Sequence, residues 1–166
     1  MLSKKWLFIV LSSIALNLSA QGHHDHEHGH NDHDHNEEHH NHIGLAMGPV
    51  YVTHEEEYAL GLHLHYTYLF KMANAEFGIG LGLETIFDEH RHYATSINFS
   101  YLPIHNLTLT VAPGIQFGPE SEEFTSHFEA TYEFILGDIH LGPVLEYAYA
   151  KEDEHAMLGL HVGFGF

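Results

Sequence analysis

Apolar and polar side chains alternate in steps of two along eight successive stretches that begin at residue 43 and continue to the C-terminus. The last stretch, AMLGLHVGFGF over residues 156–166, is the clearest, because one parity is apolar and the other holds mainly glycine and histidine. A repeat of two is the period of a β-strand. The stretches cover residues 43–53, 57–70, 75–87, 93–103, 107–117, 124–136, 139–150 and 155–166. We therefore predict an all-β domain of eight antiparallel strands over residues 43–166.

The tyrosines and phenylalanines of these stretches fall on the apolar parity, and the opposite parity carries glycine, alanine, serine, threonine, histidine and glutamate. Parity alone does not say which face is inside, because a soluble barrel of lipocalin type would bury the aromatic face. Glycines are frequent on the polar face, and glycine suits a crowded interior better than a strand that faces water. The aromatic residues gather toward strand ends, as in barrels that span outer membranes. These features favour an up-and-down transmembrane barrel with its polar face inside.

Residues 1–20 have the features of a secretory signal peptide. Lys4 and Lys5 precede an apolar run over residues 6–16, and small or polar residues follow at Ser19 and Ala20. This order of charge, apolar run and small residues is typical of signal peptides. The run is too short to cross a bilayer as a helix, which argues against a membrane anchor. We expect cleavage after Ala20 or Gly22.

The chain is strongly acidic, with 23 Asp and Glu against 5 Lys and Arg and a formal net charge of −18. Loss of the signal peptide removes Lys4 and Lys5 and no acidic residue, so the mature chain is more negative still. Nucleic acid and anionic lipid surfaces are therefore poor partners, and cations are good ones. The chain has no cysteine, which excludes disulfides and thiolate metal sites.

Residues 21–42 form a tail that reads HHDHEHGHNDHDHNEEHHNH from His23 onward. With almost no apolar side chain it cannot bury a core, so we expect it to be disordered by itself. Neutral imidazole is a common ligand for zinc, nickel and copper, and nearby carboxylates can complete or orient the shell. The alternatives are a solvated polar spacer or a purification tag. The candidate ligands are His23, His24, His26, His28, His30, His33, His35, His39, His40, His42, Asp25, Asp32 and Asp34.

The connections between the predicted strands alternate in character, with short turns at residues 71–74, 104–106 and 137–138 and more charged connections at 54–56, 88–92, 118–123 and 151–154. In strand number, alternation, turn asymmetry and its closing strand, the segment 43–166 resembles the small eight-stranded outer-membrane β-barrels of OmpA/OmpX type. The resemblance implies a bacterial outer-membrane location, contact with the membrane lipid, and a tail on the periplasmic side with the short turns. In that class, a last strand with an aromatic C-terminus is recognised by the barrel-assembly machinery, a role that the resemblance gives to Phe166.

The predicted barrel interior departs from that class, in which Arg or Lys pairs with Glu. Lys71, Arg91 and Lys151 all fall in connections. The inward parity instead carries Glu76, Glu84, Glu129, Glu133, Glu146, His63, His65, His127, His140 and His161. The short turn at 137–138 sets Glu129 opposite Glu146, which is unfavourable unless a shared proton, a protonated histidine or a cation relieves the repulsion. Similar counting places His63 and His65 opposite Gly82 and Gly80.

We therefore predict a second divalent-metal site or transit path inside the barrel, near the middle of its height, built from His63, His65, Glu129, Glu146 and His161. The alternative is a hydrogen-bonded polar plug of water and protonated carboxylates, because eight strands enclose only enough room for side chains. Histidines and carboxylates in the charged connections predict either a solvated rim or a weak cation-collecting one.

The predicted function is an outer-membrane barrel that binds divalent transition-metal ions through its tail, zinc foremost and nickel or copper as alternatives, with metal uptake or buffering as the role. The alternative is a structural or adhesive outer-membrane barrel in which the tail is incidental. We do not expect an enzyme, because the strand histidines have inward parity and Ser126 on the outward face has no outward base beside it.

Overall fold

The computed structural model describes residues 39–88, 92–118, 122–151 and 154–166. The predicted signal peptide lies outside these residues, as do the tail histidines from His23 to His35 and the three candidate aspartates. Among the described residues, no helix is long and apolar enough to cross a lipid bilayer.

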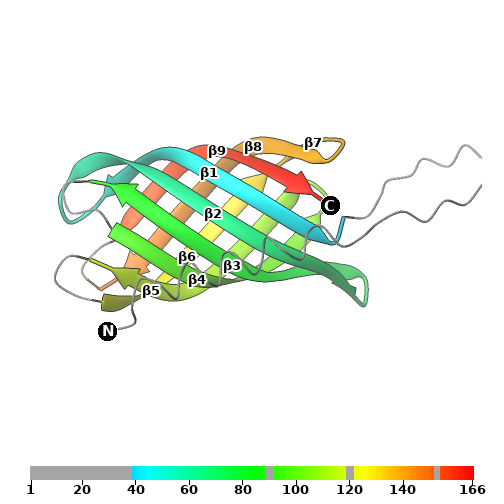
Figure 1. The fold of residues 1–166 in the computed structure, drawn as a ribbon, viewed down its shortest axis with the longest axis horizontal. Coiled ribbons are helices and arrows are strands. Elements are labelled where there is room, and N and C mark those ends of the chain that lie inside the picture. Colours follow the sequence, from blue (N-terminus) through cyan, green and yellow to red (C-terminus); the bar gives the residue numbers. More distant parts are fainter. Residues whose placement is uncertain (1–38, 89–91, 119–121, 152–153) are drawn as a thin grey trace, which may run out of the picture. The chain divides into compact units, whose positions relative to one another are not determined.

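The described strands form one antiparallel sheet that closes on itself as an eight-stranded barrel (Figure 1). They are β1 (Asn41–Val52), β2 (Glu57–Met72), β3 (Ala75–Phe87), β4 (His92–Ile104), β5 (Leu107–Phe117), β6 (Glu122–Tyr132), β7 (Phe134–Leu136), β8 (Ile139–Ala150) and β9 (His155–Gly165). From β1 to β6 each strand pairs with the next, β8 pairs with β6, β7 and β9, and β1 pairs with β9 to close the barrel. Segments β6 and β7 together are the predicted sixth strand, which is interrupted at Glu133.

The two faces of the barrel wall match the predicted parity. On β1 the burial alternates strictly from His42, which is buried, to Val52, which is also buried. Apart from Phe77, which is half-buried, the aromatic residues that were assigned outward have between about a third and three quarters of their surface exposed. The prediction of a barrel with an aromatic exterior is therefore confirmed.

The chain termini of the barrel meet at the same end as the short turns (Figure 1). At that end Asn41 and Phe166 exchange two backbone hydrogen bonds, at 3.0 and 2.9 Å. Gly137, in the turn between β7 and β8, has a φ of 68°, and Ala73 between β2 and β3 has a φ of 57°. Glycine adopts this left-handed conformation at little cost, whereas alanine does so only under the constraint of a tight turn.

The turn at Ala73 corrects one part of the predicted register. Strand β2 continues to Met72, which pairs with Ala75, so the turn holds two residues rather than four. Both predicted pairs are therefore displaced by two positions: His65 lies opposite Gly82 instead of Gly80, and His63 lies opposite Glu84 instead of Gly82. The register at the other turn is confirmed, since Glu129 pairs with Glu146.

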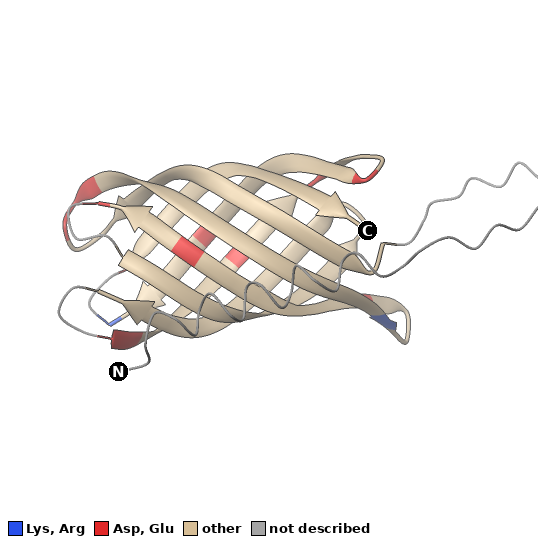
Figure 2. Cartoon of the chain, viewed as in Figure 1, with Lys and Arg blue, Asp and Glu red and all other residues tan. Residues whose placement is uncertain are grey.

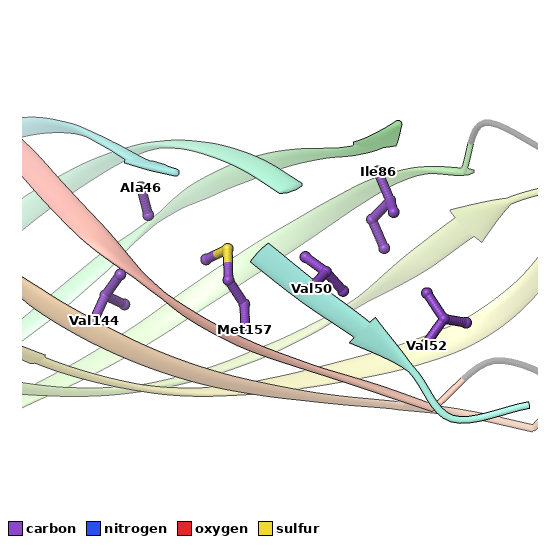
Figure 3. Close-up of a cluster of buried hydrophobic side chains, with 6 residues drawn as sticks. All are labelled: Ala46, Val50, Val52, Ile86, Val144 and Met157. Atoms are coloured by element: carbon purple, nitrogen blue, oxygen red, sulfur yellow. The ribbon is translucent and has the colours of Figure 1, made fainter. Parts of the chain in front are cut away.

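Part of the interior is apolar. Six buried side chains from β1, β3, β8 and β9 form a cluster inside the barrel (Figure 3). They are Ala46, Val50, Val52, Ile86, Val144 and Met157. Burial of such side chains is worth on the order of 1.5–3 kcal/mol for each large residue. The remaining interior is therefore left to polar side chains.

Candidate metal centres in the barrel lumen

The charged side chains of the barrel wall are distributed by sign. Acidic positions lie part-way along the wall, whereas the basic positions among the described residues lie only near its two ends (Figure 2). The buried ionisable residues within the described ranges are Glu84, Glu129, Glu133, Glu146, His42, His63, His65, His127, His155 and His161, without a lysine or arginine. A buried carboxylate needs a compensating positive charge or a proton. Among the buried residues that the structure describes, histidine is the basic type that could supply such a charge.

Strand β1 makes room for imidazole rings that come from its two neighbours. Its inward positions near the middle are Gly44 and Ala46. On one side Gly44 pairs with His65 and Ala46 pairs with His63. On the other side Ala46 pairs with His161. Because the central strand carries almost no side chain there, rings from β2 and β9 can extend across it.

We call His42, His65, His161, His140 and Glu133 the histidine cluster. The rings of His65 and His161 are parallel within 2°, with centroids 5.1 Å apart. The ring of His42 lies 5.6 Å from that of His65 and 5.5 Å from that of His161. Ligand atoms of these three histidines lie within 4.8 Å of one another.

The carboxylate of Glu133 lies close to the nitrogens of three of these histidines. Its Oε1 is 3.1 Å from His161 Nδ1 and 3.6 Å from both His140 Nδ1 and His42 Nε2. His140 in turn stacks on His42 with centroids 5.0 Å apart. The break between β6 and β7 occurs at Glu133 itself, so the interrupted strand supplies the acidic group of the histidine cluster.

We call Glu84, His127, Glu146 and His155 the mixed cluster, whose four ligand atoms also lie within 4.8 Å of one another. His127 Nδ1 is 2.6 Å from Glu146 Oε1, and its Nε2 is 3.5 Å from Glu84 Oε2. His155 Nε2 is 3.1 Å from Glu84 Oε1. These residues come from β3, β6, β8 and β9, so the cluster ties opposite walls of the barrel together.

His63 and Glu129 connect the two clusters. His63 Nδ1 lies 3.3 Å from Glu129 Oε2 and 3.2 Å from Glu146 Oε2. Its ring also contacts that of His65 edge-on, with centroids 5.7 Å apart. A single imidazole thus lies between the facing pair of carboxylates that the sequence predicted, where a proton on its ring would relieve their repulsion.

The predicted lumen residues are close together, but they do not form one site. His63, His65 and Glu129 make one group, and Glu146 belongs to the mixed cluster. His161 joins His65 in the histidine cluster. Two of the partners that complete these groups were assigned elsewhere, because His42 was counted with the tail and His155 with the charged rim. Glu84 and His127 had inward parity, but nothing in the sequence pattern brought them to Glu146.

His42 requires a correction of the predicted boundary between tail and barrel. Strand β1 begins at Asn41, so His42 is an inward residue of the barrel and is buried. His39 and His40 lie just before it: His39 Nε2 is 3.3 Å from Asp138 Oδ1, and the His40 ring lies 6.2 Å from that of Tyr68. These two histidines contact the barrel rim, where the chain ends and the short turns meet.

At the opposite end, the charged connections are only partly described. His92 Nδ1 lies 2.7 Å from Asp88 Oδ2. The neighbouring residues 89–91, 119–121 and 152–153 lie outside the described ranges. The cation-collecting rim stays a prediction.

No protein-family model matches this chain, and no curated protein sequence does. Solved structures do match its fold. The Ail protein of Yersinia pestis, in complex with the heparin analogue sucrose octasulfate, aligns with a TM-score of 0.55 at 13% identity, covering 76% of this chain and 97% of Ail. Neisserial surface protein A aligns with a TM-score of 0.53 at 9% identity, covering 76% of this chain and 97% of that protein. At such identities the likeness establishes the fold: this chain is a closed eight-stranded antiparallel barrel of the outer-membrane type.

Proposed function

We propose that this chain is an outer-membrane barrel that binds divalent transition-metal ions, zinc foremost and nickel or copper as alternatives, through its lumen and its histidine-rich tail. The observation that carries the proposal is the composition of the lumen. Four buried glutamates are accompanied there by buried histidines and, within the described residues, by no lysine or arginine. Imidazole can exchange a proton for a metal ion, whereas a lysine or arginine cannot, so this lumen can take up a cation without losing its charge balance.

The ligand chemistry is that of borderline metals. Imidazole nitrogen and carboxylate oxygen are the common non-thiolate ligands of zinc, and imidazole also suits nickel and copper. Magnesium and calcium favour sites made of oxygen ligands. The proposal therefore predicts zinc, nickel and copper as ligands in preference to magnesium and calcium.

The location follows from the fold and the exterior. The exposed aromatic and aliphatic side chains would contact lipid, with the aromatic girdles at the two membrane surfaces. The tail precedes β1 at the end of the barrel where the short turns lie, and we assign this end to the periplasm. We propose that Phe166 ends the strand that the barrel-assembly machinery recognises. We do not expect the chain to be an enzyme.

The alternative is a structural or adhesive barrel without a metal role. Ail is named as an attachment protein, and its complex is with a sulfated sugar. A polysulfated ligand is a poor match for the present chain, whose net charge is −18. We therefore favour the cation-binding function.

The test compares the zinc content of three forms of the full chain, purified in detergent without metal-affinity resin. The first is unchanged. In the second, the tail variant, His23, His24, His26, His28, His30, His33 and His35 are replaced by Asn. In the third, the lumen variant, His127 and His161 are replaced by Asn.

We expect the tail variant to lose the weaker zinc ions and to keep the tighter ones, and the lumen variant to do the reverse. Elemental analysis after gel filtration, together with calorimetric titration, would measure both. Equal zinc binding by the unchanged chain and the tail variant would remove the tail from the mechanism. If the tail variant retained no zinc at stoichiometric concentration, the lumen would be a proton-balanced plug.

A further inference from the structure

The histidine cluster and the mixed cluster differ in the atoms that they offer. Within the histidine cluster, the imidazoles of His42, His65 and His161 form a group without a carboxylate, whereas the mixed cluster combines two imidazoles with two carboxylates. We propose that His42, His65 and His161 form an all-nitrogen metal site with an open coordination position, separate from a closed site at the mixed cluster. This inference rests on the proposed function and specifies its chemistry.

The first observation in its favour is an unused buried nitrogen. His161 is 1% exposed, and within the described residues neither Nδ1 nor Nε2 of its ring has a hydrogen-bond partner. A buried polar atom without a partner is costly. A metal ion bound to Nε2 would remove that cost.

The second observation is the place of Glu133. Its Oε1 lies 3.1 Å from Nδ1 of the same ring. Metal-binding histidines commonly direct their other ring nitrogen at a carboxylate, which fixes the tautomer and raises the basicity of the ligand. A proton on His161 Nδ1 would lie near Glu133, which would leave the Nε2 lone pair for a metal.

The third observation is that the ring nitrogens face glycines, which carry no side chain. A Cβ at Gly44 would overlap His161 Nε2 and would lie 2.5 Å from His65 Nε2. A Cβ at Gly163 would overlap His42 Nε2. The ring tips of all three histidines therefore lie against glycine backbone, and any larger residue at these two positions would displace them.

The geometry requires only small adjustments. Zinc binds imidazole nitrogen at about 2.0–2.1 Å, so three such nitrogens around one ion lie roughly 3.3 Å apart. The ligand atoms here lie within 4.8 Å of one another, and modest ring rotations would close the difference. Three protein ligands leave a fourth position for water or for an incoming ligand, as in exchangeable zinc sites. The mixed cluster, with four protein ligands, leaves none.

The experiment uses the tail variant of the full chain, so that lumen sites are seen alone, with Zn²⁺ and Cu²⁺ as probes. Gly44→Ala is the test substitution and Gly61→Ala is its matched control. Gly61 lies on the adjacent strand with inward parity, and its Cβ would also overlap a side-chain atom, Cγ2 of Val50, but would meet no histidine. A change in electrophoretic mobility on heating, as folded barrels show, would confirm that each variant is folded.

We expect the tail variant to bind two zinc ions, and Gly44→Ala to weaken one of them at least tenfold while Gly61→Ala weakens neither. His161→Ala should remove the same ion, and Glu84→Gln should weaken the other. The electron paramagnetic resonance spectrum of the first Cu²⁺ bound should show coupling to several nitrogens, and His161→Ala should reduce that coupling.

The outcomes separate the two proposals. If Gly44→Ala and His161→Ala keep both zinc ions and the nitrogen coupling, the all-nitrogen site is wrong and the proposed function rests on the mixed cluster. If the tail variant binds no zinc at all, metal binding in the lumen fails altogether, and the all-nitrogen site fails with it.

Discussion

The two clusters in the lumen both hold buried histidines, but they differ in how many carboxylates accompany the imidazole rings. In the mixed cluster each imidazole is in contact with a carboxylate, as in the 2.6 Å contact between His127 and Glu146. In the histidine cluster the rings of His65 and His161 contact each other, and only Glu133 offers a charge. The mixed cluster therefore offers a complete set of four ligands, whereas the three imidazoles of His42, His65 and His161 leave one coordination position open. The comparison teaches that a complete ligand set has no position for an incoming ligand, while an incomplete one does.

The largest expected effect is on stability. His127→Ala would leave Glu146, which is 0% exposed, with His63 as its remaining described partner. Removal of one member of a buried ion pair typically costs about 3–5 kcal/mol. We expect a loss of that size in the free energy of unfolding of the metal-free protein at neutral pH. Urea titration in detergent micelles, followed by circular dichroism, would measure it.

His65→Ala is the control for this prediction. The ring of His65 contacts the rings of His63 and His161, so its loss should lower the free energy of unfolding by less than half as much as His127→Ala does. Equal losses for the two variants would indicate that the glutamates of the mixed cluster are protonated, and that the contrast between the clusters is not one of charge.

The second prediction concerns pH. An imidazole must be neutral to bind a metal, and its ordinary pKa of about 6.5 means that protons compete increasingly as the pH falls. We expect zinc affinity in the tail variant to fall at least a hundredfold between about pH 7.5 and pH 5.

Calorimetric titration of Glu84→Gln and His161→Ala over this pH range would report on the two clusters separately. A flat profile for either variant would mean that carboxylates alone hold the metal at the remaining site.

The smallest expected effect comes from a permanent positive charge inside the barrel. Thr110 is buried and pairs with Glu129 across β5 and β6. A lysine at this position would pair with Glu129 at every working pH, so that the carboxylate no longer attracts a metal. We expect Thr110→Lys to weaken zinc binding at the nearby mixed cluster by about tenfold, or about 1.4 kcal/mol. Thr110→Val is the control, and an unchanged affinity would show that net lumen charge does not govern binding.

The fold could be predicted from the sequence because its determinants are local. Period-two alternation marked every strand, and the aromatic parity marked the exterior. The pairing of Glu129 with Glu146 followed from a two-residue turn that Gly137 makes recognisable. The turn at Ala73 is equally short, but alanine gives no such indication, and the predicted register there was displaced by two residues.

The candidate site was less predictable, because its contacts cross the lumen. Parity placed Glu84 and Glu146 on the inward face, but not at the same height on opposite walls, which depends on how the strands are staggered when the barrel closes. His42 was missed for a different reason. Its neighbours in the sequence are polar and histidine-rich, so composition placed it in the tail, although in the fold it begins the inward face of β1.

The position of the histidine cluster across the seam of the barrel links metal binding to assembly. His42 lies on the first strand and His161 on the last, and β1 and β9 become neighbours only when the barrel closes. The three-nitrogen set therefore does not exist in a partly folded chain. A metal ion bound there would link the first strand to the last, so that separation of β1 from β9 would first require release of the ion. Unfolding would become slower in its presence, while the early steps of insertion would proceed at the same rate with or without it.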